Sequence, residues 1–191
     1  MLGEYYVTDS NMSRYNEQYT SIAKIYEDLE DYDTALTMLD KCVNDKYNAR
    51  IIEKKGYILI KSKKYKEASD VFKKLMEDVY EKRMMLYMLN KHIFMYMLCF
   101  LASDDIVGAI LNFESISKFD CTFHSSGKGI FIHNIIKALE ENNITAFELA
   151  CSQFSNVNKL EPDHVTLLTQ IKSTIITMTD LYISDDDSDI C

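Results

Sequence analysis

The sequence predicts an all-α protein, in which helices pair into hairpins that stack into a superhelix and end in a C-terminal helical bundle. Three observations lead to this fold class. The 191 residues include five glycines and one proline, too few for the many tight turns that β-sandwiches and barrels require. Apolar residues recur at spacings of three and four, as on one face of a helix. Two stretches also repeat one another at a fixed offset.

The first half of the chain contains four predicted helical stretches, each marked by apolar residues at helical spacing. An acidic break at residues 30–33 separates the first two stretches. The apolar positions of the four are Ile22, Ile25, Tyr26 and Leu29; Leu36, Leu39 and Val43; the run from Ile51 to Lys61; and Val71, Phe72, Leu75 and Val79.

The most apolar stretch of the chain runs from Met84 to Ala102. Asn90, Lys91 and His92 interrupt it near its middle, and charge at the centre of a membrane span is costly. We therefore expect a buried helix of a soluble protein over this stretch. A further helix is expected from the spacing of Ile106, Ile110, Phe113 and Ile116.

The last third of the chain is expected to start with a flexible loop at Ser125–Gly129, which holds two of the five glycines. A helix pair follows at Ile130–Glu141 and Ile144–Val157. Pro162 suits the first turn of a last helix, where its missing N–H costs nothing. That helix carries Val165, Leu168, Ile171, Ile175, Met178 and Tyr182, and Ser184–Cys191 is expected to be an unstructured acidic tail.

The internal repeat has the pattern [Leu/Ser]-x-x-Tyr-x-x-Ala-x-x-x-[Leu/Phe], which starts at Leu29 and again at Ser62, 33 residues later. Tetratricopeptide units are helix–turn–helix hairpins with a period of about 34 residues. The alanine of this pattern recurs at Ala109 and Ala146, at less regular intervals. We therefore predict tetratricopeptide-like hairpins over residues 1–120, a helical bundle over 121–183 and an acidic tail over 184–191. An irregular helical bundle is the alternative.

Composition narrows the class of partner and the compartment. The net charge of −9 disfavours nucleic acid as the main partner, because phosphate binding requires a basic surface. The five cysteines stand at wide spacings without a CxxC pair, as is typical of a reducing compartment. Residues 1–17 carry acids and lack the apolar core of a signal peptide. We expect a cytoplasmic protein.

Signals of catalysis are weak. The four histidines lack zinc-binding spacing, and SSGKG at 125–129 lacks the first glycine and the Ser/Thr of a phosphate loop. Asp185-x-Asp187-x-Asp189 resembles the start of a calcium loop but lacks its glycine and glutamate. We expect no enzyme, no cofactor and no metal site.

Two groups of charged residues remain as candidate binding sites. Arg50, Lys54 and Lys61 share one helix face, so they form either a solvated face or a basic surface for an acidic helical partner. Further basic residues follow at Lys63, Lys64, Lys66, Lys82, Arg83 and Lys91. The second group is acidic. Two of its residues lie at the C-terminal end of a predicted helix, where negative charge interacts unfavourably with the helix macrodipole, and the others lie in the tail. The group is therefore either a docking site for a basic partner or a solubility tail. It consists of Glu140, Glu141, Asp185, Asp186, Asp187 and Asp189.

Four segments carry a family resemblance in their order and spacing. They are SIAKIYE at 21–27, YKEASDVF at 65–72, ALEENN at 138–143 and LEPDHVTLLTQIKSTI at 160–175, followed by the acidic tail. They resemble the soluble NSF attachment proteins (SNAPs), most closely the alpha type. The resemblance covers roughly residues 12–191, which correspond to the C-terminal two-thirds of a family member.

The resemblance implies an adaptor without an active site. SNAPs wrap around the acidic four-helix bundle of syntaxin-like and related SNARE proteins, and they recruit NSF, a hexameric AAA+ ATPase. NSF then separates the SNAREs in membrane fusion, vesicle and ER–Golgi transport. By position, Arg50 and Lys54 match basic residues that face the SNARE bundle. The residues that match the ATPase-binding acids and the stimulating aliphatic residue are Glu140, Glu141, Asp185, Asp186, Asp187, Asp189 and Ile190.

Two residues depart from the family pattern. Glu17 stands where a basic residue would face the SNARE bundle, and Lys137 stands where the family has an acid. The family's N-terminal hairpins, with their membrane-binding loop, lie outside the resemblance. We therefore expect only indirect, peripheral contact with membranes. The alternative function is a helical-repeat scaffold of an unrelated complex.

Overall fold

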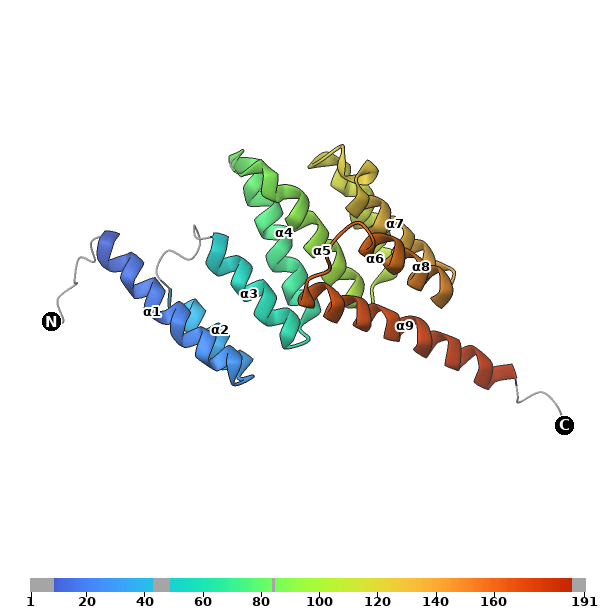
Figure 1. Cartoon of the computed structure of the whole chain (residues 1–191), viewed down its shortest axis with the longest axis horizontal. Helices are drawn as coiled ribbons and strands as arrows, with labels where there is room; N and C mark the ends of the chain where they lie inside the picture. Colours follow the sequence, from blue (N-terminus) through green and yellow to red (C-terminus); the bar gives the residue numbers. More distant parts are fainter. Residues whose placement is uncertain (1–8, 43–48, 84, 187–191) are drawn as a thin grey trace.

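The computed structural model describes residues 9–42, 49–83 and 85–186, and these residues form helices and no strand. Four antiparallel helix pairs follow one another, and a last helix runs back across them (Figure 1). The all-α prediction is confirmed. The helices are α1 (Asp9–Asp28) and α2 (Tyr32–Asp40), α3 (Ala49–Lys61) and α4 (Tyr65–Lys82), α5 (Leu89–Ala102) and α6 (Ile106–Ser115), α7 (Gly127–Glu140) and α8 (Ile144–Ser155), and α9 (Pro162–Asp186).

Each hairpin turns in the same way. One residue takes a positive φ angle, and the next residue is the N-cap of the second helix. The residues with positive φ are Glu30, Lys63, Asp104 and Asn142. At three of these turns the N-cap side chain accepts a hydrogen bond from the backbone N–H three residues later, which satisfies one of the helix's unpaired donors. These caps are Asp31, Asp105 and Asn143.

Small residues allow the two helices of a hairpin to pack closely. Ala35, Ala68 and Ala109, three of the repeated alanines, are fully buried, and Ala146 is partly buried against the same core. Between α3 and α4, a Cβ added to Gly56 would lie 2.8 Å from the ring of Phe72. The repeated small position therefore marks the contact between paired helices.

The core is continuous across the hairpins. One hydrophobic cluster reaches from Ile52 in α3 to Ile175 in α9, and a smaller cluster joins α1 and α2 to α3. The C-terminal helices thus share a core with the hairpins before them. The division into hairpins over residues 1–120 and a C-terminal helical bundle over residues 121–183 stays a prediction.

The most apolar stretch is a buried helix, as predicted, but it begins later. Met85 takes a positive φ of 55° and a 3₁₀ turn follows at Leu86–Met88. Helix α5 starts at Leu89 and is buried along almost its whole length. Tyr87 is exposed, so residues 85–88 are not part of the buried helix that was expected there, since apolar composition alone does not predict burial. Met84, the first residue of the expected helix, lies outside the described residues. Among the described residues, no helix combines the length and hydrophobicity of a membrane span.

The expectation of a flexible loop at Ser125–Gly129 was wrong. Ser126 caps α7 by accepting a hydrogen bond from the N–H of Gly129, and Gly127 is already helical. A Cβ on Gly129 would overlap the carbonyl oxygen of Phe123 and lie 2.9 Å from the Cα of His124. This glycine is thus required for close packing of α7 on the preceding turn, and it does not indicate flexibility.

Candidate functional site

The predicted basic pair lies in a hollow between α1 and α3. Arg50 is exposed in the first turn of α3, and Lys54 follows one turn later on the same face, half-buried. The hollow has a volume of about 610 Å³ and is lined by Asn16, Glu17, Thr20, Ser21, Arg50, Ile51 and Lys54. Glu17, the departure from the family pattern, therefore lines the same hollow as Arg50. Its carboxylate reduces the positive potential there.

The two basic residues differ in their availability. The Lys54 ammonium lies 3.5 Å from the carbonyl oxygen of Thr20 and 3.8 Å from a carboxylate oxygen of Glu27. The other carboxylate oxygen of Glu27 accepts from Lys61 at 2.5 Å, and this hydrogen bond raises the pKa of Lys61. Arg50 makes no ion pair within the described residues. Its guanidinium is therefore the cation of this pair that is free to bind a partner.

Several other basic residues from the sequence are bound to acids of a neighbouring element. Lys64 binds Asp33 at 2.7 Å and Lys91 binds Glu53 at 2.5 Å. Lys82 lies 3.4 Å from Asp78 in its own helix. These ion pairs neutralise part of the expected basic surface. Sequence reasoning missed the carboxylates, although each cross-hairpin pair is separated by about one repeat length, 31 to 38 residues.

The predicted acidic pair lies at the turn between α7 and α8. Glu140 is the last residue of α7, Glu141 is its C-cap, and both are exposed. The N–H of Glu141 donates to the carbonyl of Lys137, so the turn has a fixed backbone. Two carboxylates at a helix C-terminus weaken the helix through its dipole. Their exposure leaves them available to a basic partner.

The acidic tail is only partly described. Helix α9 continues through Asp186, so Ser184, Asp185 and Asp186 belong to the helix and not to an unstructured tail as expected. Asp187, Asp189 and Ile190 lie outside the described residues. In Figure 1 the end of α9 and the turn between α7 and α8 lie toward the same end of the molecule, opposite to α1.

A second polar hollow, of about 500 Å³, lies where the start of α9 meets α3, α5 and α7. It is lined by Tyr57, Lys91, Phe94, Lys128, Glu161, Pro162, Asp163 and His164. Burial is the main cause that lowers the pKa of Lys128, and the charge of Lys91 lowers it further. Burial also raises the pKa of Asp163 and lowers that of His164. Cations and carboxylates both line this hollow, so it favours neither an anionic nor a cationic ligand. No motif predicted it, because its residues come from four helices.

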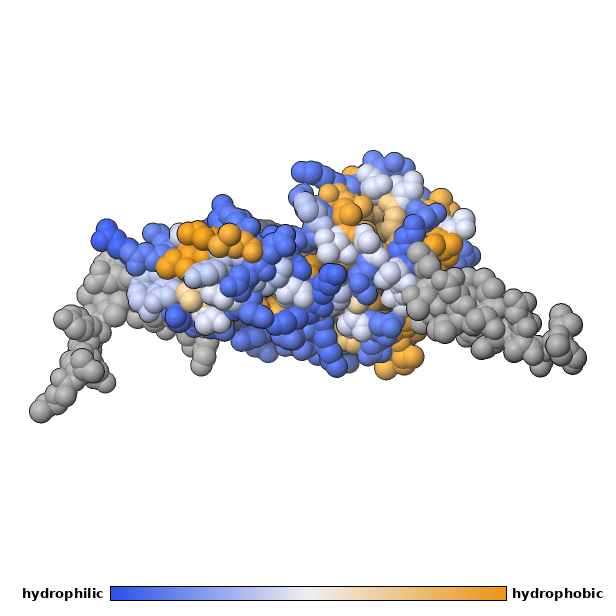
Figure 2. Space-filling view, turned by 90° about the horizontal axis from the view of Figure 1, so that it is seen from below, coloured by the Kyte–Doolittle hydropathy of each residue, from blue (hydrophilic) through white to orange (hydrophobic). Residues whose placement is uncertain are grey.

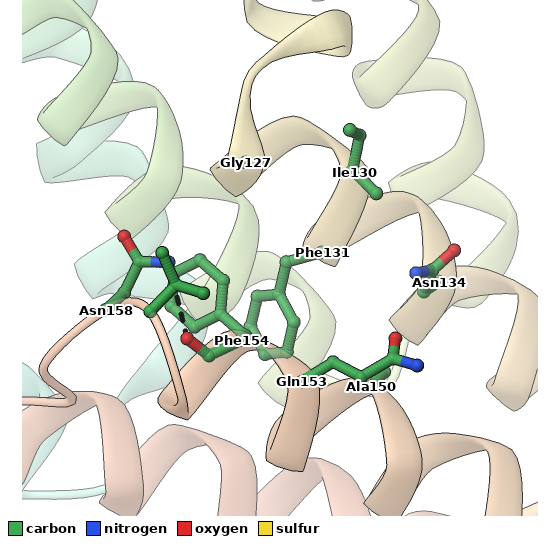
Figure 3. Close-up of a pocket in the computed structure, with 9 residues that line it drawn as sticks. Gly127, Ile130, Phe131, Asn134, Ala150, Gln153, Phe154 and Asn158 are labelled. Carbon is green, nitrogen blue, oxygen red and sulfur yellow. Dashed lines mark hydrogen bonds between the residues drawn. The ribbon is translucent and has the colours of Figure 1, made fainter.

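An apolar hollow of about 200 Å³ opens between α7 and α8 (Figure 3). The rings of Phe131 and Phe154 stack at its base, with centroids 4.2 Å apart. Asn158 donates to the carbonyl oxygen of Phe154 at 3.3 Å and fixes the end of α8. Within the described residues, no group of three or more His, Cys, Asp or Glu is placed to hold a metal ion.

Comparison with known proteins gives matches along nearly the whole chain. The family model described as "Soluble NSF attachment protein, SNAP" matches residues 44–176. A tetratricopeptide repeat model matches residues 19–44, which include the second half of α1 and all of α2. The two matches share only residue 44. Together they cover the acidic turn and most of the basic hollow, although Asn16 and Glu17 of the hollow lie before the matched residues.

Individual relatives carry the same name at low identity. The chain is 21% identical to the alpha-soluble NSF attachment protein of Dictyostelium discoideum over 179 residues, which cover 90% of this chain and 62% of the relative. It is 29% identical to that of Saccharomyces cerevisiae over 111 residues, 58% of this chain and 38% of the relative. It is 21% identical to the human alpha-soluble NSF attachment protein over 168 residues, which cover 83% of this chain and 56% of the relative. The chain thus spans at most about three-fifths of the length of these relatives.

Proposed function

The chain belongs to the soluble NSF attachment protein family, and from this premise we propose that it is an adaptor between SNARE complexes and NSF. In this role it binds the acidic four-helix SNARE bundle, recruits the hexameric ATPase and stimulates SNARE disassembly in vesicle transport. It carries out no catalysis itself. It acts in the cytoplasm and reaches membranes through its partners.

The observation that carries the proposal is the separation of the two charged sites. The exposed cation Arg50 lies in the hollow between α1 and α3, and the exposed acids Glu140 and Glu141 lie at the α7–α8 turn. These elements occupy opposite halves of the elongated molecule (Figure 1). An adaptor that joins an acidic partner to a basic one needs such a separation, because both partners must bind at once.

A capture assay with an assembled SNARE four-helix bundle tests the basic end. Arg50→Glu should lower the captured amount several-fold at low salt, and the difference should shrink at high salt, because exposed charges act through screened attraction. Lys73→Glu is the matched control, since Lys73 is exposed on α4, lies outside the hollow and does not belong to the predicted basic group. Arg50 is preferred to Lys54, whose reversal would place a carboxylate beside Glu27 and disturb the fold.

The acidic end is tested by adding NSF to the captured complex. Glu140→Lys with Glu141→Lys should retain SNARE binding and lose NSF recruitment. Glu67→Lys with Asp70→Lys on α4 is the control pair, because both acids are exposed and lie on another element. If the parent chain captures neither the SNARE bundle nor NSF, the adaptor proposal fails and a scaffold for an unrelated complex replaces it.

A further inference from the structure

Helix α1 has an apolar face that no described part of the chain covers. Its inner face packs on α2 and α3 through the fully buried Ala23. On its outer side, Ile22, Ile25 and Leu29 are 38%, 59% and 69% exposed, and Tyr15 is 38% exposed. Figure 2 shows an apolar patch over this end of the molecule. We refer to Tyr15, Ile22, Ile25 and Leu29 as the α1 stripe.

The α1 stripe has the spacing of a helix–helix seam. Tyr15, Ile22 and Leu29 are seven residues apart, and Ile25 falls between the last two, which is the a/d pattern of paired helices. The N–H of Leu29 donates to the carbonyl of Ile25 at 3.1 Å, so Leu29 stays in helical register. Exposed apolar side chains that form a continuous patch commonly mark an interaction site. The α1 stripe therefore indicates an interface.

The charges that flank the α1 stripe indicate what binds there. Arg14 precedes its first residue, and Asp28 precedes its last residue. Both are exposed, and neither forms an ion pair within the described residues. A complementary helix must be apolar at the same spacing, with an acid near Arg14 and a base near Asp28. Helix α1 itself, in the opposite direction, meets all of these requirements.

We propose that α1 pairs antiparallel with α1 of a second copy of this chain about a two-fold axis near Ile22. Tyr15 of each copy then lies beside Leu29 of the other, and Arg14 lies beside Asp28. Both contacts occur twice, as in any isologous interface. A parallel pair would place like charges together. Specific interfaces bury roughly 1,200–2,000 Å², and a single pair of helices offers little area, so we expect a weak dimer that depends on concentration.

Sedimentation velocity of the 191-residue chain from about 1 to about 500 μM tests the proposal, since small interfaces dissociate in this range. We expect a reversible monomer–dimer equilibrium. Ile25→Lys with Leu29→Lys should weaken it at least about tenfold, because both side chains lose their burial. Val107→Lys with Leu111→Lys on α6 is the control, since these residues are 70% and 62% exposed, and it should leave the equilibrium unchanged. The helical circular dichroism of both variants should match that of the parent.

A charge exchange tests the direction of pairing. Arg14→Glu and Asp28→Arg should each weaken the dimer, and the two together should restore it, because each opposite-sign contact reappears with its signs exchanged. A chain that stays monomeric throughout the range overturns the proposal. So does a dimer that resists the α1 substitutions or that the double exchange fails to restore. These readouts involve neither SNAREs nor NSF, so they do not depend on the proposed adaptor role.

Discussion

At the scale of single residues, the hairpin turns rely on backbone conformations that most side chains disfavour. Glu30, Lys63, Asp104 and Asn142 take φ angles between 47° and 66°. Glycine usually occupies such positions, because a Cβ is unfavourable there. Asn and Asp tolerate the conformation better than Glu and Lys. The turns at Glu30 and Lys63 therefore carry strain that a glycine would relieve.

Lys63→Gly should stabilise the protein by about 0.5–1 kcal/mol, because glycine has no Cβ atom that would be unfavourable in the left-handed conformation. Lys73→Gly is the control, since Lys73 is an exposed residue in the middle of α4. There glycine should cost about 1 kcal/mol of helix stability. Chemical unfolding of both variants measures the difference. A loss of stability in Lys63→Gly would show that the turn is not strained.

The two glycines at the start of α7 should respond in opposite ways to alanine. Gly129→Ala should destabilise the protein by about 1–3 kcal/mol or more, because the added methyl overlaps the backbone of Phe123 and overpacking forces a backbone shift. Gly127→Ala has no atom within 4 Å of the new methyl, and it should be neutral or slightly stabilising. Thermal unfolding compares the two variants. Equal melting temperatures would contradict the tight packing of this turn.

The buried His92 should make stability depend on pH. Only 3% of this residue is exposed and its Nδ1 has no hydrogen-bond partner within the described residues. Burial is the main cause that lowers its pKa below 6.5, with a smaller contribution from Lys91, while Glu53 acts in the opposite direction. The unfolded chain therefore binds the proton more readily than the folded chain. Stability should fall as the pH drops below about 6.5, the ordinary value for His.

Unfolding free energies measured between about pH 8 and pH 5 test this dependence, which spans the ordinary His pKa. His92→Met should flatten the slope, because the variant has no proton to gain at this position. Burial also lowers the pKa of His164, so this histidine should preserve part of the pH dependence in the His92→Met variant. A variant at His92 with the full slope would mean that other groups cause it.

At the scale of elements, the contacts between hairpins follow the repeat. Lys61 binds Glu27 and Lys54 approaches Thr20, each 34 residues back in the chain. Lys91 binds Glu53, 38 residues back. Equivalent positions of successive hairpins thus lie side by side. The apolar spacing and the repeated alanines were enough to predict the hairpins. The ion pairs were not predictable, because helical spacing specifies a face of one helix and not the neighbour that it meets.

Glu27→Gln should destabilise the protein by about 1 kcal/mol, since one largely buried carboxylate serves both Lys54 and Lys61 and exposed single pairs contribute at most this much. The loss should decrease in high salt. Glu17→Gln is the control on the same helix, because Glu17 is exposed and has no ion pair within the described part of the chain. Equal unfolding midpoints for the two variants would show that the pairing of α1 with α3 does not depend on this charge.

At the scale of the whole molecule, the path of α9 determines which sites form. Pro162 starts the helix as the sequence predicts, but α9 then packs on α3 and α5 as well as on α8. Leu167 and Ile171 are fully buried there. The periodicity identified the apolar face of α9, and it could not identify the surface that covers it. The polar hollow around Lys128 was missed for the same reason. Arg50, Glu140 and Glu141 could be named as candidates from the sequence because local charge patterns marked them.

The last prediction concerns Ile190 and requires the complex of the chain with SNAREs and NSF. Ile190 is a lone aliphatic residue after four aspartates, and it lies outside the described residues. A tail that only confers solubility has no need of an apolar residue. A docking tail does, because aspartates attract a basic surface and one aliphatic side chain fills a pocket in it.

Burying such a side chain contributes about 1.5–3 kcal/mol, roughly ten- to a hundred-fold in an equilibrium. Ile190→Ala should therefore reduce the ATP hydrolysis that NSF shows in the SNARE-bound complex, while SNARE capture and thermal stability stay as in the parent. Ile190→Leu is the conservative control and should keep the parent rate, because leucine fills the same volume. Equal rates for the parent and Ile190→Ala would mean that the aspartates act without an apolar anchor, and the stimulating role would have to lie in Glu140, Glu141 or the end of α9.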